Sequence, residues 1–477
     1  MIQYFKLGSW DRLILLIILF VIIQFHFCFL SQDILLPELL WLRLGQRLAD
    51  GWMLYGHTLD ETAPLSALVY AGIAKTRLTD FHIYRYLGSA LILIQALWLN
   101  QICRRFVLFT DRNFLVAFFY IIFSHVGPDG VSLSPTIMAA TCIIAGYGRI
   151  FKIIRFGPDN NDTMFMGLSI GLAVLFYQPS ALFIFPFCLS AVFFSGMRLN
   201  QYFIVLVAMI LPSAFVYTFF VLWGGTNEFW LCFLSPFRFG FLHSWVGWDL
   251  IFGFGGFLLL LSFAGWAVAN NNSKVNFQLL GFSVFFFGLV VAALSVFVGA
   301  IQSTYQLFLL VPHAAFFMAQ FVSYSRSILL QEILVLFIFL IMIGSFFGMA
   351  DPTFGRQIFG HKLFVDEPPK GFVANFKNKN LLLLSNDFRY YKYNPPSTRF
   401  FKFYLSGLHN DLSQTHEGLI YWYECLEEDS PQLIYDPYGL VPALAVRIPE
   451  FGKCYRASFY PKLYEAIPGT RFGGGLK

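Results

Sequence analysis

The sequence predicts an all-α polytopic membrane bundle of about 11 transmembrane helices, followed by a small C-terminal extracytoplasmic α/β domain. Hydrophobic residues make up 57% of the 477 residues and charged residues only 12%, whereas about a quarter of the residues in a soluble domain are charged. Apolar runs recur as far as residue 350. The polar, aromatic and Pro-rich sequence after it contains no run long enough to cross a bilayer.

A helix that crosses a bilayer needs about 20 predominantly apolar residues. The first such run, Leu13–Leu30, follows Lys6 and Arg12 and leads into polar sequence without a small-residue cleavage site. We therefore expect a retained helix with its N-terminus in the cytoplasm, and not a signal peptide. The expected spans lie near residues 13–31, 85–103, 113–126, 132–150, 163–177, 180–196, 202–223, 247–269, 277–300, 303–323 and 329–349.

Lysine and arginine residues mark alternate ends of the expected spans, as the positive-inside rule requires. An odd number of spans places the C-terminus outside, opposite the cytoplasmic N-terminus. In the bacterial inner membrane, where we expect the protein to lie, the C-terminus is then periplasmic. Because the cations cluster at helix ends, the net charge of +5 indicates topology, and nucleic acid is excluded as a partner. The cations of the expected inside turns are Arg104, Arg105, Arg112, Arg149, Lys152, Arg155, Arg198, Lys274 and Arg326.

Two domains are expected: a transmembrane domain over residues 1–350, whose first outer loop covers 32–84, and an extracytoplasmic domain over 351–477. Short apolar runs in the C-terminal domain are typical of buried strands. The expected elements are strands at Lys379–Ser385, Leu433–Tyr435 and Ala443–Val446, and a helix at His409–Tyr423. The sequence leaves open whether Cys425 and Cys454 form a disulfide, since it does not give their separation.

The first outer loop contains two short helical patterns. Asp50-Gly51 ends the first, because glycine commonly follows a helix, and Pro64 begins the second, because proline suits the first turn. Leucine recurs every fourth residue in the first pattern, which predicts an amphipathic helix lying on the membrane surface with one apolar face down. These residues are Leu36, Leu40, Leu44 and Leu48. The buried stripe expected on the second helix is Leu65, Leu68, Val69 and Ile73.

The order of features through this loop is distinctive: an acid after the first span, an amphipathic helix ending in glycine, a Pro-Leu segment, and an arginine that opens the second span. The residues concerned are Glu38, Leu39–Asp50, Gly51, Tyr55, Ala63-Pro64-Leu65 and Arg85. Further along, Ser-Asn-Asp-Phe-Arg-Tyr-Tyr at 385–391 precedes Pro-Pro-Ser-Thr-Arg-Phe at 395–400. In these features the chain resembles the GT-C class of membrane glycosyltransferases, which includes protein O-mannosyltransferases and lipid A aminoarabinose transferases.

The resemblance implies that the protein moves a sugar from a polyprenyl-phosphate-linked donor to a glycan, lipid or protein acceptor on the outer side of the membrane. Glu38 is then the expected base, or the ligand of a divalent metal ion such as Mg²⁺ or Mn²⁺. Asp33 and Asp129 are further candidate acids. A simpler alternative for Glu38 is an interfacial carboxylate that caps its helix or pairs with Arg43 or Arg47.

The donor phosphate requires cations, and arginine can pair with two phosphate oxygens at once. The outside cations are Arg43, Arg47, Lys75, Arg77 and Arg85. A simpler alternative is that these side chains only extend toward lipid head groups. Other candidate substrate-binding residues come from the same loop and other outside loops: Tyr55, His125, Gln178, His243, Gln302 and Tyr305. No paired His or Cys spacing indicates a dedicated metal site.

One other function is compatible with this sequence. The chain could keep the GT-C scaffold as a non-catalytic membrane subunit of a cell-envelope assembly, with other membrane proteins as its partners. A transporter or polymerase of lipid-linked glycans would instead require charged residues deep within the spans, and such residues are scarce here.

Overall fold

The computed structural model describes residues 2–5, 9–29, 33–76, 80–127, 129–237, 276–296, 298, 304–325, 327–350, 363–402, 405, 416–470 and 472. The chain forms two compact units. The helical unit comprises Met1–Asp33, Asp80–Phe219 and Leu234–Phe364. The mixed unit comprises Ile34–Thr79, Phe220–Phe233 and Val365–Lys477. The first outer loop thus groups with C-terminal residues, and a separate domain beginning at residue 351 stays a prediction.

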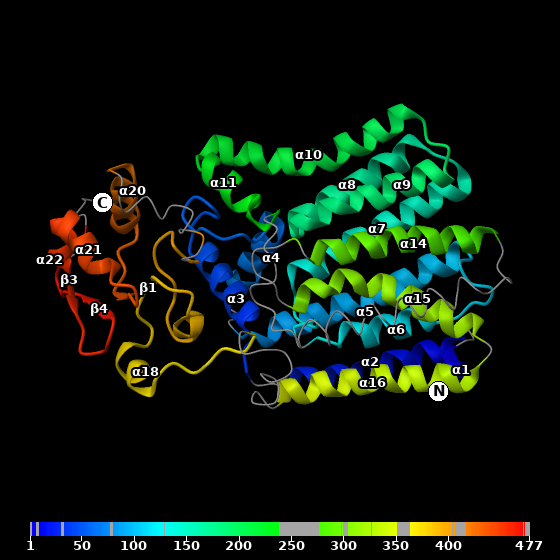
Figure 1. Ribbon diagram of the computed structural model, residues 1–477, viewed down its shortest axis with the longest axis horizontal. Coiled ribbons are helices and arrows are strands. Elements are labelled where there is room, and N and C mark those ends of the chain that lie inside the picture. Colours follow the sequence, from blue (N-terminus) through cyan, green and yellow to red (C-terminus); the bar gives the residue numbers. More distant parts are fainter. Residues whose placement is uncertain are drawn as a thin grey trace. The chain divides into compact units, whose positions relative to one another are not determined.

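The long helices of the helical unit run side by side (Figure 1). Short 3-10 segments precede α9 and α15, at the points where the expected outside turns lie. The elements are α1 (Ile2–Phe5), α2 (Trp10–Phe29), α5 (His82–Arg105), α6 (Leu115–Ser124), α7 (Pro135–Phe156), α8 (Asn160–Phe176), η1 (Gln178–Phe183), α9 (Ile184–Phe194), α10 (Leu199–Trp223), η2 (Ser235–Phe237), α14 (Asn276–Val296), η4 (Thr304–Leu310), α15 (Val311–Tyr324) and α16 (Ile328–Ala350).

Helices α6 and α15 form the interior of this unit and pack against each other. All ten residues of α6 are buried, and α15 is buried from Val311 to Val322. A helix that is apolar on every face requires neighbours on every side. By contrast, α10 leaves most of its apolar side chains exposed, including Leu199 and Phe215, as expected of a helix that faces lipid.

Five of the described helices are long and apolar enough to cross a membrane, which confirms a multi-pass membrane bundle. They are His82–Arg105, Pro135–Phe156, Leu199–Trp223, Gln278–Val296 and Thr304–Tyr324. Three shorter apolar helices accompany them: Leu115–Ser124, Gln178–Phe194 and Ile328–Gly344. The number of about 11 spans stays a prediction, and the span expected at 247–269 lies outside the described residues.

The mixed unit combines short helices with a four-stranded sheet in the order β1-β2-β4-β3. Strands β1 and β2 are parallel, whereas β4 runs antiparallel to both of its neighbours. The elements are α3 (Leu36–Ala49), α4 (Pro64–Lys75), α11 (Thr226–Phe233), α18 (Lys370–Phe376), β1 (Leu381–Leu383), η5 (Phe388–Lys392), α20 (His416–Glu428), β2 (Leu433–Tyr435), α21 (Leu440–Arg447), α22 (Pro449–Cys454), β3 (Tyr455–Ala457) and β4 (Leu463–Ala466).

Two of the three expected C-terminal strands are confirmed as β1 and β2. The strand expected at Ala443–Val446 is wrong, because these residues lie in α21. Val441 and Leu444 are its buried positions, and this spacing of three is helical, not extended. The Asp436 carboxylate accepts the Val441 backbone N–H at 2.7 Å and stabilises the first turn. The expected helix is present as α20, shifted to His416–Glu428 among the described residues.

Helices α3 and α4 pack closely through small residues. A Cβ atom on Gly45 would lie 2.6 Å from the Tyr70 carbonyl oxygen, so glycine permits this approach. Nine of the 14 residues of α3 are buried, on more than one face. The stripe expected on α4 is wrong: Leu68 is 66% exposed, and Leu65, Val69 and Ile73 are only half-buried. The residues that α4 buries are Ser66, Ala67, Tyr70 and Ala71.

A second close approach holds the start of α5 against the loop before α7. The Leu133 backbone N–H donates to the Tyr84 carbonyl at 2.9 Å. One turn further along α5, a Cβ atom on Gly88 would lie 2.2 Å from the Val131 carbonyl oxygen. The nearest atoms belong to the backbone of the loop. A side chain at position 88 would therefore fit only if the whole loop moved.

We expect Gly88→Ala to destabilise the protein by about 1–3 kcal/mol through overpacking. Gly148→Ala is the matched control on α7, because its Cβ would meet only Ile102, at 3.5 Å. Thermal unfolding of both variants in detergent, followed by intrinsic fluorescence, measures the difference. Equal melting temperatures for the two variants would contradict the close packing of α5 on this loop.

Candidate functional site

Helix α3 carries Glu38 in its first turn, fully buried. Its Oε2 atom accepts the Leu35 backbone N–H at 3.0 Å, which is the glutamate half of a capping box. A carboxylate at this end also interacts favourably with the positive end of the helix dipole. The capping alternative for Glu38 is thus confirmed, and its role as a base or metal ligand stays a prediction.

Arg43 joins α3 to the segment around η5. Its guanidinium donates to the carbonyl oxygens of Tyr391 at 2.6 Å and Lys392 at 2.9 Å. A third bond reaches the Gln46 side chain at 2.8 Å. Burial lowers the pKa of Arg43 to about 10, so the group stays charged at neutral pH.

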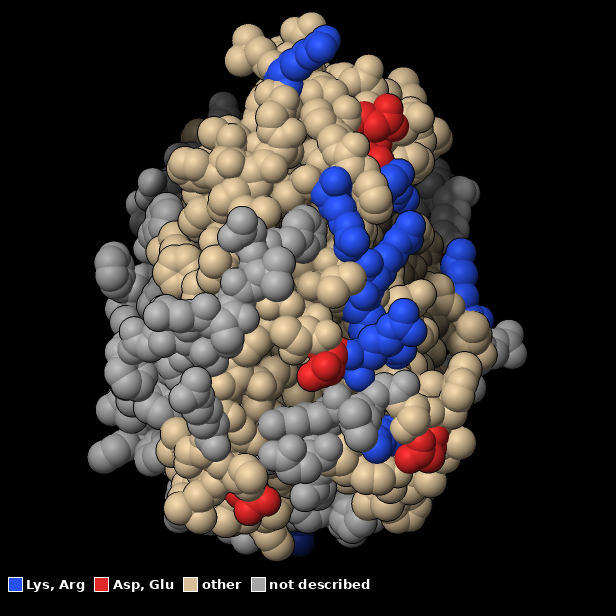
Figure 2. Space-filling model, turned by 90° about the vertical axis from the view of Figure 1, so that its right-hand side faces the viewer, with Lys and Arg blue, Asp and Glu red and all other residues tan. Residues whose placement is uncertain are grey.

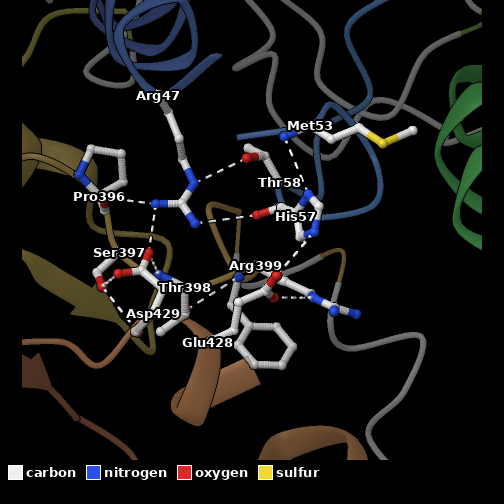
Figure 3. A network of polar contacts seen from close by, with 11 residues as sticks. Arg47, Met53, His57, Thr58, Pro396, Ser397, Thr398, Arg399, Glu428 and Asp429 are labelled. Atoms are coloured by element: carbon white, nitrogen blue, oxygen red, sulfur yellow. Dashed lines mark hydrogen bonds and ion pairs between the residues drawn. The ribbon is translucent and has the colours of Figure 1, made fainter. Parts of the chain in front are cut away.

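Arg47 lies one turn further along α3 and is 4% exposed. Its Nη1 atom lies 2.8 Å from Asp429 Oδ2 in a buried ion pair (Figure 3). Its Nε atom donates to the Thr58 hydroxyl at 3.0 Å. Further bonds reach the carbonyl oxygens of His57 and Pro396, both at 3.2 Å. The donors of Arg47 thus bind the first loop and two C-terminal segments together.

The partner carboxylate is itself held by neighbouring donors. The Thr398 backbone N–H donates to Asp429 at 2.8 Å, and the Ser397 hydroxyl donates at 3.1 Å (Figure 3). Glu428, the preceding residue, lies 2.9 Å from His57 Nε2 and 3.1 Å from Arg399 Nε. Two successive carboxylates at the end of α20 therefore receive contacts from both the first loop and the 396–399 segment.

A buried acid pair was missed by the sequence analysis. Lys402 Nζ lies 3.1 Å from Asp60 and 3.2 Å from Glu61, and Lys402 and Asp60 are almost fully buried. Burial alone would lower the pKa of Lys402, but the two carboxylates outweigh it and raise the pKa. In the sequence, the two adjacent acids just before Pro64 could have indicated a polar site here. Lys402 could not have been found in this way, because it is far away in the chain.

Tyr55 is fully buried and adopts a left-handed backbone conformation, with φ +64°. Its hydroxyl donates to the Thr62 carbonyl at 2.9 Å. Its ring packs 5.4 Å from the Phe220 ring and 5.7 Å from the Phe229 ring. Tyr55 therefore helps to shape the turn between α3 and α4.

In the helical unit, the structure brings Asp33 and Arg85 together. Arg85 is fully buried, and its Nη2 atom donates to the Asp33 backbone carbonyl at 2.9 Å. Its guanidinium also lies 4.9 Å from the centre of the Phe81 ring. Arg85 thus ties the segment that follows α2, at Asp33, to the start of α5.

The structure also brings Asp129 and Tyr305 together. The buried Asp129 carboxylate accepts the Tyr305 backbone N–H at 2.9 Å and the Thr304 hydroxyl. The Thr136 hydroxyl donates to the Tyr305 carbonyl at 2.8 Å. Since the loop containing Asp129 also bonds to the start of α5, these candidates share one end of the helical unit.

The remaining candidates are dispersed. His125 is buried, with one ring nitrogen 2.9 Å from Gln24 Oε1 and the other 2.6 Å from the Ile121 carbonyl. Gln178 is buried at the start of η1, and Lys75 is exposed at the end of α4. The candidates outside the described residues are Arg77, His243 and Gln302.

The described residues contain no group of three or more His, Cys, Asp or Glu side chains that could hold a metal ion. A metal-ligand role for Glu38 stays a prediction. Cys425 and Cys454 are separate thiols and form no disulfide. Burial raises the pKa of Cys425 to about 12, which keeps that thiol protonated.

Comparison with known proteins identifies the fold. No protein-family model matches the sequence, and no curated protein matches it. The structure is similar to ArnT from Cupriavidus metallidurans bound to undecaprenyl phosphate, with a TM-score of 0.57 at 9% identity over 97% of this chain and 99% of that one. It is also similar to an Archaeoglobus fulgidus oligosaccharyltransferase tethered with an acceptor peptide, with a TM-score of 0.50 at 11% identity over 93% and 72% of the chains.

Both of these proteins are GT-C glycosyltransferases. The fold of this chain is therefore the GT-C fold, and the resemblance drawn from the first loop is confirmed. At such low identity, the similarity defines the architecture and leaves the roles of individual residues to the geometry described above.

We expect Arg47→Gln to destabilise the protein by about 3 kcal/mol, the lower end of the range for a buried pair, because Asp429, whose side chain is 13% exposed, loses its cation. The double variant Arg47→Gln/Asp429→Asn should cost less than the sum of the single changes. Thermal unfolding in detergent measures all three variants. Arg389→Gln is the control, because its pair with Asp387 is about one third exposed and such pairs contribute about 0–1 kcal/mol. Additive effects at Arg47 and Asp429 would contradict a direct coupling.

Proposed function

We propose that the protein is a membrane glycosyltransferase that moves a sugar from a polyprenyl-phosphate-linked donor to an acceptor on the outer side of a bacterial inner membrane. The observation that carries the proposal is the GT-C fold along the whole chain, since the match to ArnT covers 97% of this protein and 99% of that one. That ArnT structure contains undecaprenyl phosphate, which supports a donor of the same chemical class here.

The proposed sugar transfer determines which groups the site must contain. A polyprenyl chain stays in the bilayer, so the sugar phosphate lies at the interface, where spans begin and outer loops fold. The phosphate leaves with negative charge, and a guanidinium can pair with two of its oxygens. We assign this role to Arg85, which opens a membrane span and lies at the same end of the helical unit as Asp33 and Asp129. Arg43, Arg47 and Lys75 are the cations that the mixed unit could supply.

The acceptor hydroxyl must lose its proton as the new glycosidic bond forms, and a carboxylate can take it. Glu38 is our candidate, because a first-turn carboxylate is held in one orientation by the Leu35 backbone. Asp33 is the next candidate, since it is half-buried. Asp129 ranks last, because both of its carboxylate oxygens accept hydrogen bonds from the segment at Thr304 and Tyr305.

A non-catalytic membrane subunit is the second candidate function. One observation favours it: several of the polar groups proposed for catalysis and phosphate binding also stabilise the fold. Glu38 caps α3, Arg47 pairs with Asp429, and Asp129 anchors η4. Native mass spectrometry of the purified protein separates the two functions. A bound polyprenyl phosphate supports the transferase, whereas a protein partner in fixed ratio supports the subunit.

We expect Glu38→Gln to lower sugar transfer by about 100-fold or more, the usual contribution of a general base. Glutamine keeps an oxygen that accepts the Leu35 N–H, so the melting temperature should change little. Transfer is measured in membranes with a panel of radiolabelled polyprenyl-phosphate sugars. Glu367→Gln is the control, because this carboxylate is 61% exposed. If a correctly folded Glu38→Gln protein transferred sugar at the full rate, Glu38 would be excluded as the general base.

A further inference from the structure

Basic side chains gather at one end of the helical unit. Figure 2 looks onto the right-hand side of Figure 1 and shows Lys and Arg side chains in one band, with few Asp or Glu side chains beside them. At this end α5 and α7 finish and α8 and α10 begin. The cations near these helix ends are Arg104, Arg105, Arg149, Lys152, Arg155 and Arg198. We call this group the basic band.

Direct contacts join these helix ends. The Arg155 guanidinium donates to the Arg105 carbonyl at 3.4 Å, which connects the end of α7 to the end of α5. Asp162 on α8 lies 3.0 Å from Arg149 and 2.7 Å from Lys152 on α7. Gln201 on α10 donates to the side-chain oxygen of Asn160 at 3.3 Å. The basic band is therefore one surface and not a set of scattered cations.

Exposed apolar side chains place this surface at the edge of the bilayer. Helix α10 is apolar and exposed from its first residue, Leu199, which is 86% exposed. Phe156 is 70% exposed directly after Arg155, and Val107 is 50% exposed two residues after Arg105. Cations beside exposed apolar side chains are typical of the level where lipid head groups meet acyl chains.

One acid of this end is shared between two cations, since Asp162 pairs with both Arg149 and Lys152. Arg104 and Arg105 instead lie over aromatic rings, 5.1 Å from the centre of Phe114 and 5.8 Å from that of Phe106. This end therefore presents positive charge to whatever lies at the membrane surface.

We propose that the basic band binds acidic phospholipids of the adjoining leaflet, with Arg105 and Arg155 as the main contacts to the head-group phosphates. The phosphodiester pairs with guanidinium groups, and the acyl chains lie against Phe156 and Val107. A soluble anion would make no use of the exposed apolar side chains. The inference is independent of the proposed transferase activity, because it concerns the opposite ends of α5 and α7 from Arg85 and Asp129.

Cations at helix ends also set the orientation of a protein during insertion. That role ends once the protein is in the membrane, whereas lipid binding persists in the purified protein. A binding measurement on purified protein therefore tests the proposal apart from topology.

The experiment titrates the full-length protein in detergent with phosphatidylglycerol or phosphatidylcholine and counts bound lipids by native mass spectrometry. We expect the protein to retain phosphatidylglycerol in preference to phosphatidylcholine. Each arginine removed near a membrane surface weakens anionic-lipid binding about fivefold, so Arg105→Gln/Arg155→Gln should weaken phosphatidylglycerol binding about 25-fold. Arg105→Lys/Arg155→Lys keeps the charge and should retain most of the binding.

A charge-matched control separates a local site from general attraction. Lys370→Gln/Arg456→Gln removes two exposed cations from the mixed unit and should leave phosphatidylglycerol binding unchanged. The proposal is overturned if both double variants lose binding equally, if neither loses it, or if phosphatidylcholine binds as well as phosphatidylglycerol. The melting temperature of each variant shows that it has folded, so a loss of lipid is not a loss of structure.

Discussion

The mixed unit depends on the ion pair between Arg47 and Asp429, two residues 382 positions apart in the chain. A guanidinium and a carboxylate removed from water carry a large desolvation cost, and only well-placed partners offset it. Here Arg47 also bonds to Thr58, His57 and Pro396. One side chain thereby determines how the first outer loop meets the C-terminal segments, and every candidate residue on α3 takes its position from that junction.

The helical unit satisfies a different constraint. Lipid offers no hydrogen bonds, so polar groups within a membrane bundle must find partners inside the protein. The interior helices α6 and α15 bring few polar side chains, and two of these are paired across helices: Tyr120 with Gln95 and His313 with Tyr147. Asp129 and Arg85 follow the same rule at the end of the bundle, each bonded to neighbouring backbone.

These two constraints bear on Glu38, for which a structural role and the proposed catalytic role require the same fixed orientation. A carboxylate that caps a helix is held in one orientation, and a group in a fixed orientation is also what proton transfer requires. Glu38 fits both descriptions. The contact to the Leu35 backbone accounts for the buried carboxylate through helix capping. The buried acid pair at Lys402 shows that the first loop contains more polar structure than its motif alone indicates.

The sequence by itself determined those elements that a pattern of neighbouring residues encodes. Composition and apolar runs predicted the membrane bundle, Gly51 marked the end of α3, Pro64 began α4, and the order of residues in the first loop indicated the GT-C class. Tertiary structure decided which faces are buried. Leu68 is exposed, whereas α4 buries Ser66, Ala67, Tyr70 and Ala71. Ala443–Val446 is helical within α21, whose first turn Asp436 stabilises. Long-range partners such as Arg47 with Asp429 and Lys402 with Asp60 were decided by folding alone, since no local pattern encodes which distant charges will meet.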